Sequence, residues 1–141
     1  MKKHIPNLKK WFVSSPYEPL EGEKKIVNYI YNLNNPNIKY SIYSPDSDMT
    51  LLALLLTCDR SNFKGCKYLN IVRHNQQQNH NEGIDIILLG QSMYKFINKK
   101  NNYSNVINEI VFIFTLFGND FLPKIESINV KTDFEYVIDI Y

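Results

Sequence analysis

Short strand-like runs alternate with helix-like runs along this chain, and the alternation restricts the folds that it can adopt. The strand-like runs are apolar or alternate between apolar and polar residues, and they lie at residues 11–13, 40–44, 67–72 and 84–89. Apolar residues recur at helical spacing in residues 22–33, 49–57, 92–97 and 106–117, and a last helix is expected from Asp133. Strands that alternate with helices usually form a parallel sheet covered by helices. The sequence therefore predicts an α/β domain with a mainly parallel sheet flanked by helices.

Prolines and polar segments separate these runs. Pro16 and Pro19 exclude a helix just before residue 22, and the asparagine-rich segment 34–37 ends the helix that follows. Two further polar segments, residues 74–82 and 99–105, are expected to be surface loops. Because 141 residues suit one domain with a modest core, we expect the whole chain to form a single domain.

Composition and charge exclude several classes of protein. Hydrophobic residues make up 44% of the chain, which is too many for a disordered protein. The formal net charge of +2 does not by itself indicate a nucleic-acid-binding protein. The longest apolar run, residues 110–117, is too short to span a bilayer, and residues 1–6 lack the apolar core of a signal peptide. We therefore expect a soluble intracellular protein, in the cytoplasm or nucleus, with Cys58 and Cys66 as free thiols.

Three acidic motifs lie at the ends of predicted elements. They are Glu21-Gly22-Glu23 before a helix, Asp46-Ser47-Asp48 after a strand, and residues 118–123 after a helix, which include Asp120. Carboxylates two residues apart in an extended chain point to the same side. The carboxyl ends of strands are also where open α/β sheets usually bind ligands. The five carboxylates are therefore candidate ligands of a divalent metal.

The chemistry of such a site suits phosphodiester hydrolysis. Several carboxylates gathered together repel one another unless a cation neutralises them. Mg²⁺ and Mn²⁺ prefer oxygen ligands, and two such ions roughly 3.5–4 Å apart can activate a water and stabilise a leaving oxygen. Alternatives remain open at this point, because single acidic residues at helix starts often only cap the helix, and Asp120 can be a turn former. Asp-x-Asp also occurs in metal-dependent glycosyltransferases.

The context of the acidic residues resembles one nuclease family. Residues 18–26 (EPLEGEKKI) resemble the P-G-E-G-E-H-K-I motif of the Xrn family of 5′→3′ exoribonucleases. Residues 42–49 (IYSPDSDM) are similar to the family's I-Y-G-x-D-A-D-L, and residues 117–123 are similar to its G-N-D-F-L-P block. The three motifs follow the family's order. The resemblance implies a PIN/FEN-like fold, dependence on Mg²⁺ or Mn²⁺, and RNA with a 5′-monophosphate as substrate.

The resemblance also assigns roles to individual residues. The metal-site and catalytic carboxylates of the family match Glu21, Glu23, Asp46, Asp48 and Asp120. Some positions depart from the family pattern: Leu20 replaces a glycine, and Lys24 replaces a histidine. Lys24 and Lys25 are candidate contacts for substrate phosphate, with exposure to solvent the favoured alternative for Lys24. Ser44 and Ser47 replace small residues and should be tolerated.

The family's nuclease core begins upstream of these motifs, and this affects the expected activity. The upstream half carries further acidic ligands and a basic pocket for the 5′ phosphate, so the chain is expected to be the C-terminal part of such a core. Lys2, Lys3, Lys9 and Lys10 form a basic cluster that is either a phosphate contact or a solvated terminus. We expect weak or no activity from the isolated chain. The alternatives are a half that works with a separate chain supplying the upstream part, and an inactive remnant that binds RNA or a partner.

Overall fold

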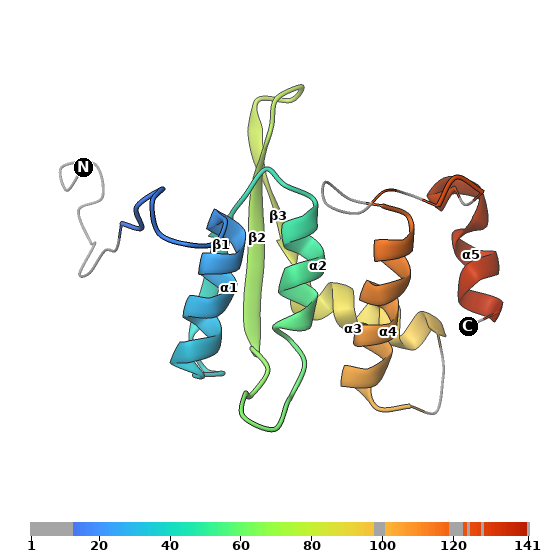
Figure 1. Cartoon of the computed structure of the whole chain (residues 1–141), viewed down its shortest axis with the longest axis horizontal. Coiled ribbons are helices and arrows are strands. Elements are labelled where there is room, and N and C mark those ends of the chain that lie inside the picture. The colour runs from blue at the N-terminus through green and yellow to red at the C-terminus, as the bar shows by residue number, and fades with distance from the viewer. Residues whose placement is uncertain (1–12, 98–100, 119–122, 124, 128, 141) are drawn as a thin grey trace.

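The computed structural model describes residues 13–97, 101–118, 123, 125–127 and 129–140. The elements follow one another as α1 (Gly22–Leu33), β1 (Lys39–Tyr43), α2 (Asp48–Leu55), β2 (Tyr68–Asn75), β3 (His80–Asp85), α3 (Ile86–Ile97), α4 (Tyr103–Leu116) and α5 (Val130–Ile140). Figure 1 shows α1 and α2 alongside the sheet, with α3, α4 and α5 following on one side of it. The predicted α/β class is confirmed. Within the described residues, no helix has the length and apolar character needed to cross a membrane.

The sheet is mixed, and the prediction of a mainly parallel sheet is therefore only half right. Its strand order is β1-β2-β3, in which β1 and β2 are parallel and β2 and β3 are antiparallel. Lys39 lies opposite Tyr68, and Ile42 lies opposite Ile71. The parallel pair needs the long crossover through α2, whereas β2 and β3 are joined directly by a turn.

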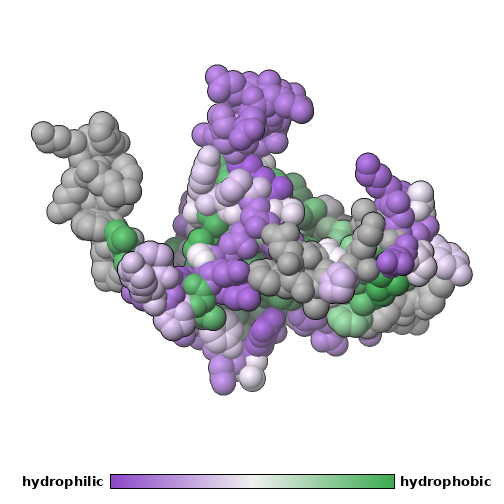
Figure 2. Space-filling model, turned by 45° about the horizontal axis from the view of Figure 1, so that its top comes forward, coloured by the Kyte–Doolittle hydropathy of each residue, from purple (hydrophilic) through white to green (hydrophobic). Residues whose placement is uncertain are grey.

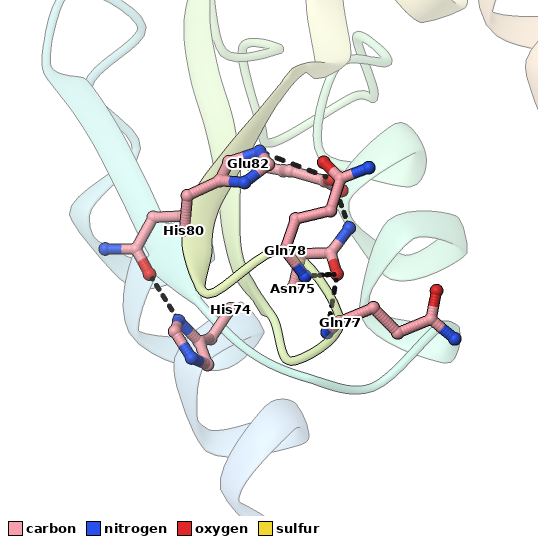
Figure 3. A network of polar contacts seen from close by, with 7 residues as sticks. His74, Asn75, Gln77, Gln78, His80 and Glu82 are labelled. Atoms are coloured by element: carbon pink, nitrogen blue, oxygen red, sulfur yellow. Dashed lines mark hydrogen bonds and ion pairs between the residues drawn. The ribbon is translucent and has the colours of Figure 1, made fainter.

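The polar segment 74–82, predicted as a surface loop, is instead the projecting part of a β-hairpin. His74 and Asn75 end β2, and His80 begins β3. The side-chain oxygen of Asn75 accepts hydrogen bonds from the backbone N–H groups of Gln77 and Gln78, at 3.0 and 3.2 Å (Figure 3). Figure 2 shows the hairpin as a hydrophilic projection from the molecule. Because the hairpin extends beyond the core, neither of its faces needs apolar residues, and the alternating pattern of a strand is absent.

The predicted strand at residues 84–89 is wrong beyond Asp85. There β3 ends, and α3 begins at Ile86. The carboxylate of Asp85 accepts a hydrogen bond from the N–H of Leu88 at 3.0 Å, as a helix-capping residue does. A short apolar run does not distinguish a buried strand from a buried helix. The capping hydrogen bond of Asp85 therefore marks the point at which the strand ends and the helix begins.

The other helices are close to their predicted positions. α1 has the predicted bounds, and it ends at Asn34 in the left-handed conformation with φ of 42°. α4 begins at Tyr103, inside the segment predicted as a loop, because the side chain of Asn102 accepts the N–H of Asn105. The first predicted strand is largely outside the described residues, but its last member, Val13, is 69% exposed and lies in no strand.

One face of the sheet carries the core. The buried cluster joins Ile42, Leu69 and Ile71 of the sheet with helical side chains, which include Ile30, Met49, Ala53, Leu54, Ile107 and Ile110. Cys58 and Cys66 are free thiols, as predicted, and both are buried; burial raises the pKa of the Cys66 thiol to about 11. On the opposite face, Tyr43 and Tyr68 are 63% and 51% exposed. Among the described residues, β1 is also an edge strand with no neighbour on its outer side.

Candidate metal centre

Four of the five predicted carboxylates lie at one end of the sheet. Glu21 is the residue before α1, and Glu23 is in its first turn. Asp46 follows β1, and Asp48 is the first residue of α2. In Figure 1 both helices begin at the end of the sheet from which the hairpin projects. The fifth predicted ligand, Asp120, lies outside the described residues.

Ser44 connects the two acidic motifs. This residue is only 6% exposed, and its own N–H donates to the carbonyl of Val72, which fixes it against β2. Its hydroxyl donates to Oε1 of Glu23 at 3.2 Å and accepts the N–H of Asp46 at the same distance. The first turn of α1 is thereby tied to the loop that follows β1. The sequence predicted only that a serine would be tolerated at this position.

Asp46 shapes the start of α2. Its Oδ1 accepts the N–H of Asp48 at 2.9 Å, so the first carboxylate of the motif caps the helix that carries the second. Glu21, by contrast, makes no capping hydrogen bond to α1. Capping is therefore an explanation for Asp46 but does not explain Glu21.

The electrostatics of Glu23 show that the acidic side chains affect one another. Burial raises the pKa of the Glu23 carboxyl, and the nearby negative charges of Asp46, Asp48 and Glu21 raise it further. The hydrogen bond from Ser44 lowers this pKa and opposes part of the effect. Mutual repulsion of this kind is relieved when a cation is bound.

The donor atoms of the described carboxylates suit a divalent metal, but the described residues supply too few closely placed ligands to hold one. The four carboxylates offer only oxygen donors, which suit Mg²⁺ or Mn²⁺. However, the described part of the chain contains no group of three acidic, histidine or cysteine side chains placed closely enough to hold a metal ion. A complete coordination shell would therefore need ligands beyond those described, such as Asp120 or water.

Arg73 contacts the second acidic motif, and the sequence did not indicate this residue as part of the site. It lies on the core-facing side of β2, and its Nη2 donates to the backbone carbonyl of Asp46 at 3.2 Å and to the hydroxyl of Thr50. Arg73 is one of only two arginines in the sequence, the other being Arg60. The sequence signal that could have found it was an arginine within an otherwise uncharged strand. The direction in which its side chain points follows only from the strand register.

The residues around the first motif also include two predicted phosphate contacts and one departure from the family pattern. Lys25 donates from Nζ to the carbonyl of Ser15 at 2.9 Å, so it supports the preceding loop. Lys24 is exposed. Leu20, which stands where the family motif has glycine, has a φ of 80°. This is the left-handed region, which a residue with a Cβ adopts only under strain.

Comparisons with known proteins agree with the motif analysis. A family model described as "XRN 5′-3′ exonuclease N-terminus" matches residues 3–64, which include the first two acidic motifs but not the third. A protein of Acanthamoeba polyphaga mimivirus, described as a "putative 5′-3′ exonuclease", is 38% identical over 143 residues. That alignment covers 92% of this chain but only 22% of the relative.

Both matches are to proteins described as 5′-3′ exonucleases. The chain belongs to the Xrn family. Since it spans about a fifth of the length of its curated relative, the activity of a whole family member is a separate question for this chain.

Proposed function

We propose that this chain contributes the acidic part of an Xrn-like 5′→3′ exoribonuclease core, which hydrolyses RNA phosphodiesters from a 5′-monophosphate end. The observation that carries the proposal is that the Ser44 hydroxyl bonds both Glu23 and the backbone of Asp46, which places the two acidic motifs side by side at one end of the sheet. Neighbouring carboxylates without a bound cation repel one another, and this repulsion raises their pKa values. Binding of Mg²⁺ or Mn²⁺ relieves the repulsion. Asp120 is proposed as a fifth ligand on the basis of the family motif.

The chain's own residues have distinct parts in this proposal. Glu21, Glu23, Asp46 and Asp48 would hold one or two ions, while Ser44 keeps Glu23 beside the second motif. A bound ion would supply an activated water and would stabilise the charge on the leaving oxygen. Lys24 remains a candidate contact for substrate phosphate, whereas the bond of Lys25 to Ser15 makes a supporting role more consistent for that residue.

The second candidate function is non-catalytic. In it, the chain is an inactive remnant, or one half of a split nuclease, that binds RNA or a separate chain carrying the upstream half. This candidate is favoured by the absence of a three-ligand group among the described residues. We expect only weak hydrolysis by the isolated chain in the first candidate and no hydrolysis in the second.

Metal binding gives the first test. Titration calorimetry with Mn²⁺ should detect binding to the wild-type chain and at least a tenfold loss in the Asp46→Ala/Asp48→Ala variant, roughly the effect of disturbing a metal's ligand set. The matched control is Glu126→Ala/Asp139→Ala, which removes the same charge from two exposed positions. Equal Mn²⁺ affinity in the two double variants would refute the proposed metal centre.

Catalysis gives the second test. The wild-type chain and the Asp46→Ala/Asp48→Ala variant are incubated with Mg²⁺ and RNA bearing either a 5′-monophosphate or a 5′-hydroxyl. Decay of only the monophosphorylated RNA, and only with the wild type, supports the exoribonuclease. RNA binding without decay supports the non-catalytic candidate, and equal decay with both proteins excludes catalysis at these residues.

A further inference from the structure

We propose that Arg73 is a positioning residue, which holds the acidic loop in the conformation that presents Asp46 and Asp48 to the metal. The acidic loop is residues 45–50, which are the turn after β1 and the first turn of α2. The proposal rests on the proposed function, since it concerns the same carboxylates. Arg73 lies on β2, whereas the acidic loop follows β1, and Arg73 is outside all three acidic motifs. Its role is to fix the backbone beneath the carboxylates, not to bind the ion.

Arg73 contacts the acidic loop near both of its ends. Its Nη2 donates to the backbone carbonyl of Asp46 and to the hydroxyl of Thr50, in the first turn of α2. Because the guanidinium binds a carbonyl and a hydroxyl, the carboxylate of Asp46 keeps its bond to the N–H of Asp48. The side chain therefore fixes the loop without neutralising the acidic groups.

A simpler structural role for Arg73 would use a different partner. In the antiparallel ladder Arg73 lies directly opposite Glu82, and opposite charges at such positions commonly pair. Glu82 instead accepts from Asn75 and lies 3.6 Å from Nε2 of His80 (Figure 3). The guanidinium turns toward the acidic loop although its Nε is left buried without an acceptor. Such an unsatisfied donor is unfavourable, so the contacts with the loop outweigh it.

Ser44 supports the same loop at Asp46. Its hydroxyl accepts the N–H of Asp46, while Arg73 donates to the carbonyl of Asp46. Both backbone polar groups of Asp46 are thus fixed, the N–H by Ser44, which follows β1, and the carbonyl by Arg73 on β2. Without Arg73, the carbonyl and Thr50 lose their shared anchor, and the loop gains conformations in which Asp46 and Asp48 diverge.

The test combines metal affinity with local hydrogen exchange. Arg73→Met should weaken Mn²⁺ binding by about tenfold, the lower end of the effect of residues that orient metal ligands. In metal-free protein, the amides of Asp48 and Thr50 should exchange faster, while the amide of Leu54 keeps its wild-type rate. Arg73→Lys should restore part of both effects, since it retains one charged donor. Arg60→Met, at the other arginine, should change neither.

The outcomes separate this proposal from the proposed function. If the wild type binds no Mn²⁺, the metal centre fails, but amide exchange still tests whether Arg73 fixes the loop. Unchanged exchange at Asp48, or equal acceleration at Leu54, would overturn the positioning role. Should Arg73→Met fail to fold, Thr50→Val removes one acceptor at nearly constant volume and should accelerate exchange at the same two amides.

Discussion

At the scale of single residues, Leu20 offers a direct test of local strain. Its φ of 80° costs free energy for any residue with a Cβ, and glycine removes this cost. We expect Leu20→Gly to raise the free energy of unfolding by up to about 1 kcal/mol, because part of the gain is offset by the larger entropy of glycine in the unfolded chain. Chemical denaturation measures the change. Leu20→Ala is the control, since it removes the side chain but keeps the Cβ, and a gain as large as that of glycine would contradict the explanation.

Glu23 makes stability depend on pH. Its folded pKa is raised above the usual glutamate value of about 4.3, so the folded state binds its proton more tightly than the unfolded state does. The contribution of Glu23 to stability is therefore present below its unfolded pKa and is lost as pH rises through its folded pKa. In metal-free protein, Glu23→Gln should flatten this part of a stability curve measured by denaturant titration.

A matched substitution checks the cause of the Glu23 shift. Ser44→Ala removes the hydrogen bond that lowers this pKa, so the pKa of Glu23 should rise further. Carbon-13 NMR of the side-chain carboxyl follows it directly. An unchanged or lower pKa in Ser44→Ala would show that the serine does not hold Glu23 as described.

The candidate site was predictable at its carboxylates and not at its supporting residues. Spacing of two and placement beside element ends were enough to bring Glu23 and Asp46 to one end of the sheet. The roles of Ser44 and Arg73 depend on strand register and on rotamer, which no local pattern specifies. The sequence therefore predicted that these carboxylates lie at one end of the sheet, but not the hydrogen bonds that orient them.

At the scale of elements, prediction succeeded where an amphipathic pattern was long and failed where burial changed along an element. α1 was predicted with its observed bounds because Ile26 and Ile30 lie on one face at helical spacing. The β2–β3 hairpin was missed because β2 is buried at Leu69 and Ile71 but exposed at His74. A strand that leaves the core loses its apolar alternation, although its hydrogen-bonded ladder continues.

At the scale of the whole molecule, the core is one-sided. The helices cover the face that carries Ile42 and Ile71, and the face that carries Tyr43 and Tyr68 is open in the described structure. Parallel strands in α/β proteins are normally covered on both faces. The arrangement is compatible with a partial domain, in agreement with the 22% of the relative that the chain spans.

The outer edge of β1 has a consequence for how the protein behaves at high concentration. The N–H of Ser44 points to β2, and alternation along the strand directs the N–H of Ser41 away from it. No strand of the described residues lies on that side, and an incoming strand can pair there. We expect the purified chain to form larger species as its concentration rises, which sedimentation velocity measures. Ser41→Pro should reduce this growth because it removes an outward donor and leaves the ladder to β2 intact.

Ser41→Ala keeps the outward N–H and should self-associate like the wild type. If the proline variant grows equally, another surface is responsible. Solubility would then not depend on this edge. If the edge is responsible, the row of backbone groups on the outer side of β1 makes the chain prone to aggregation.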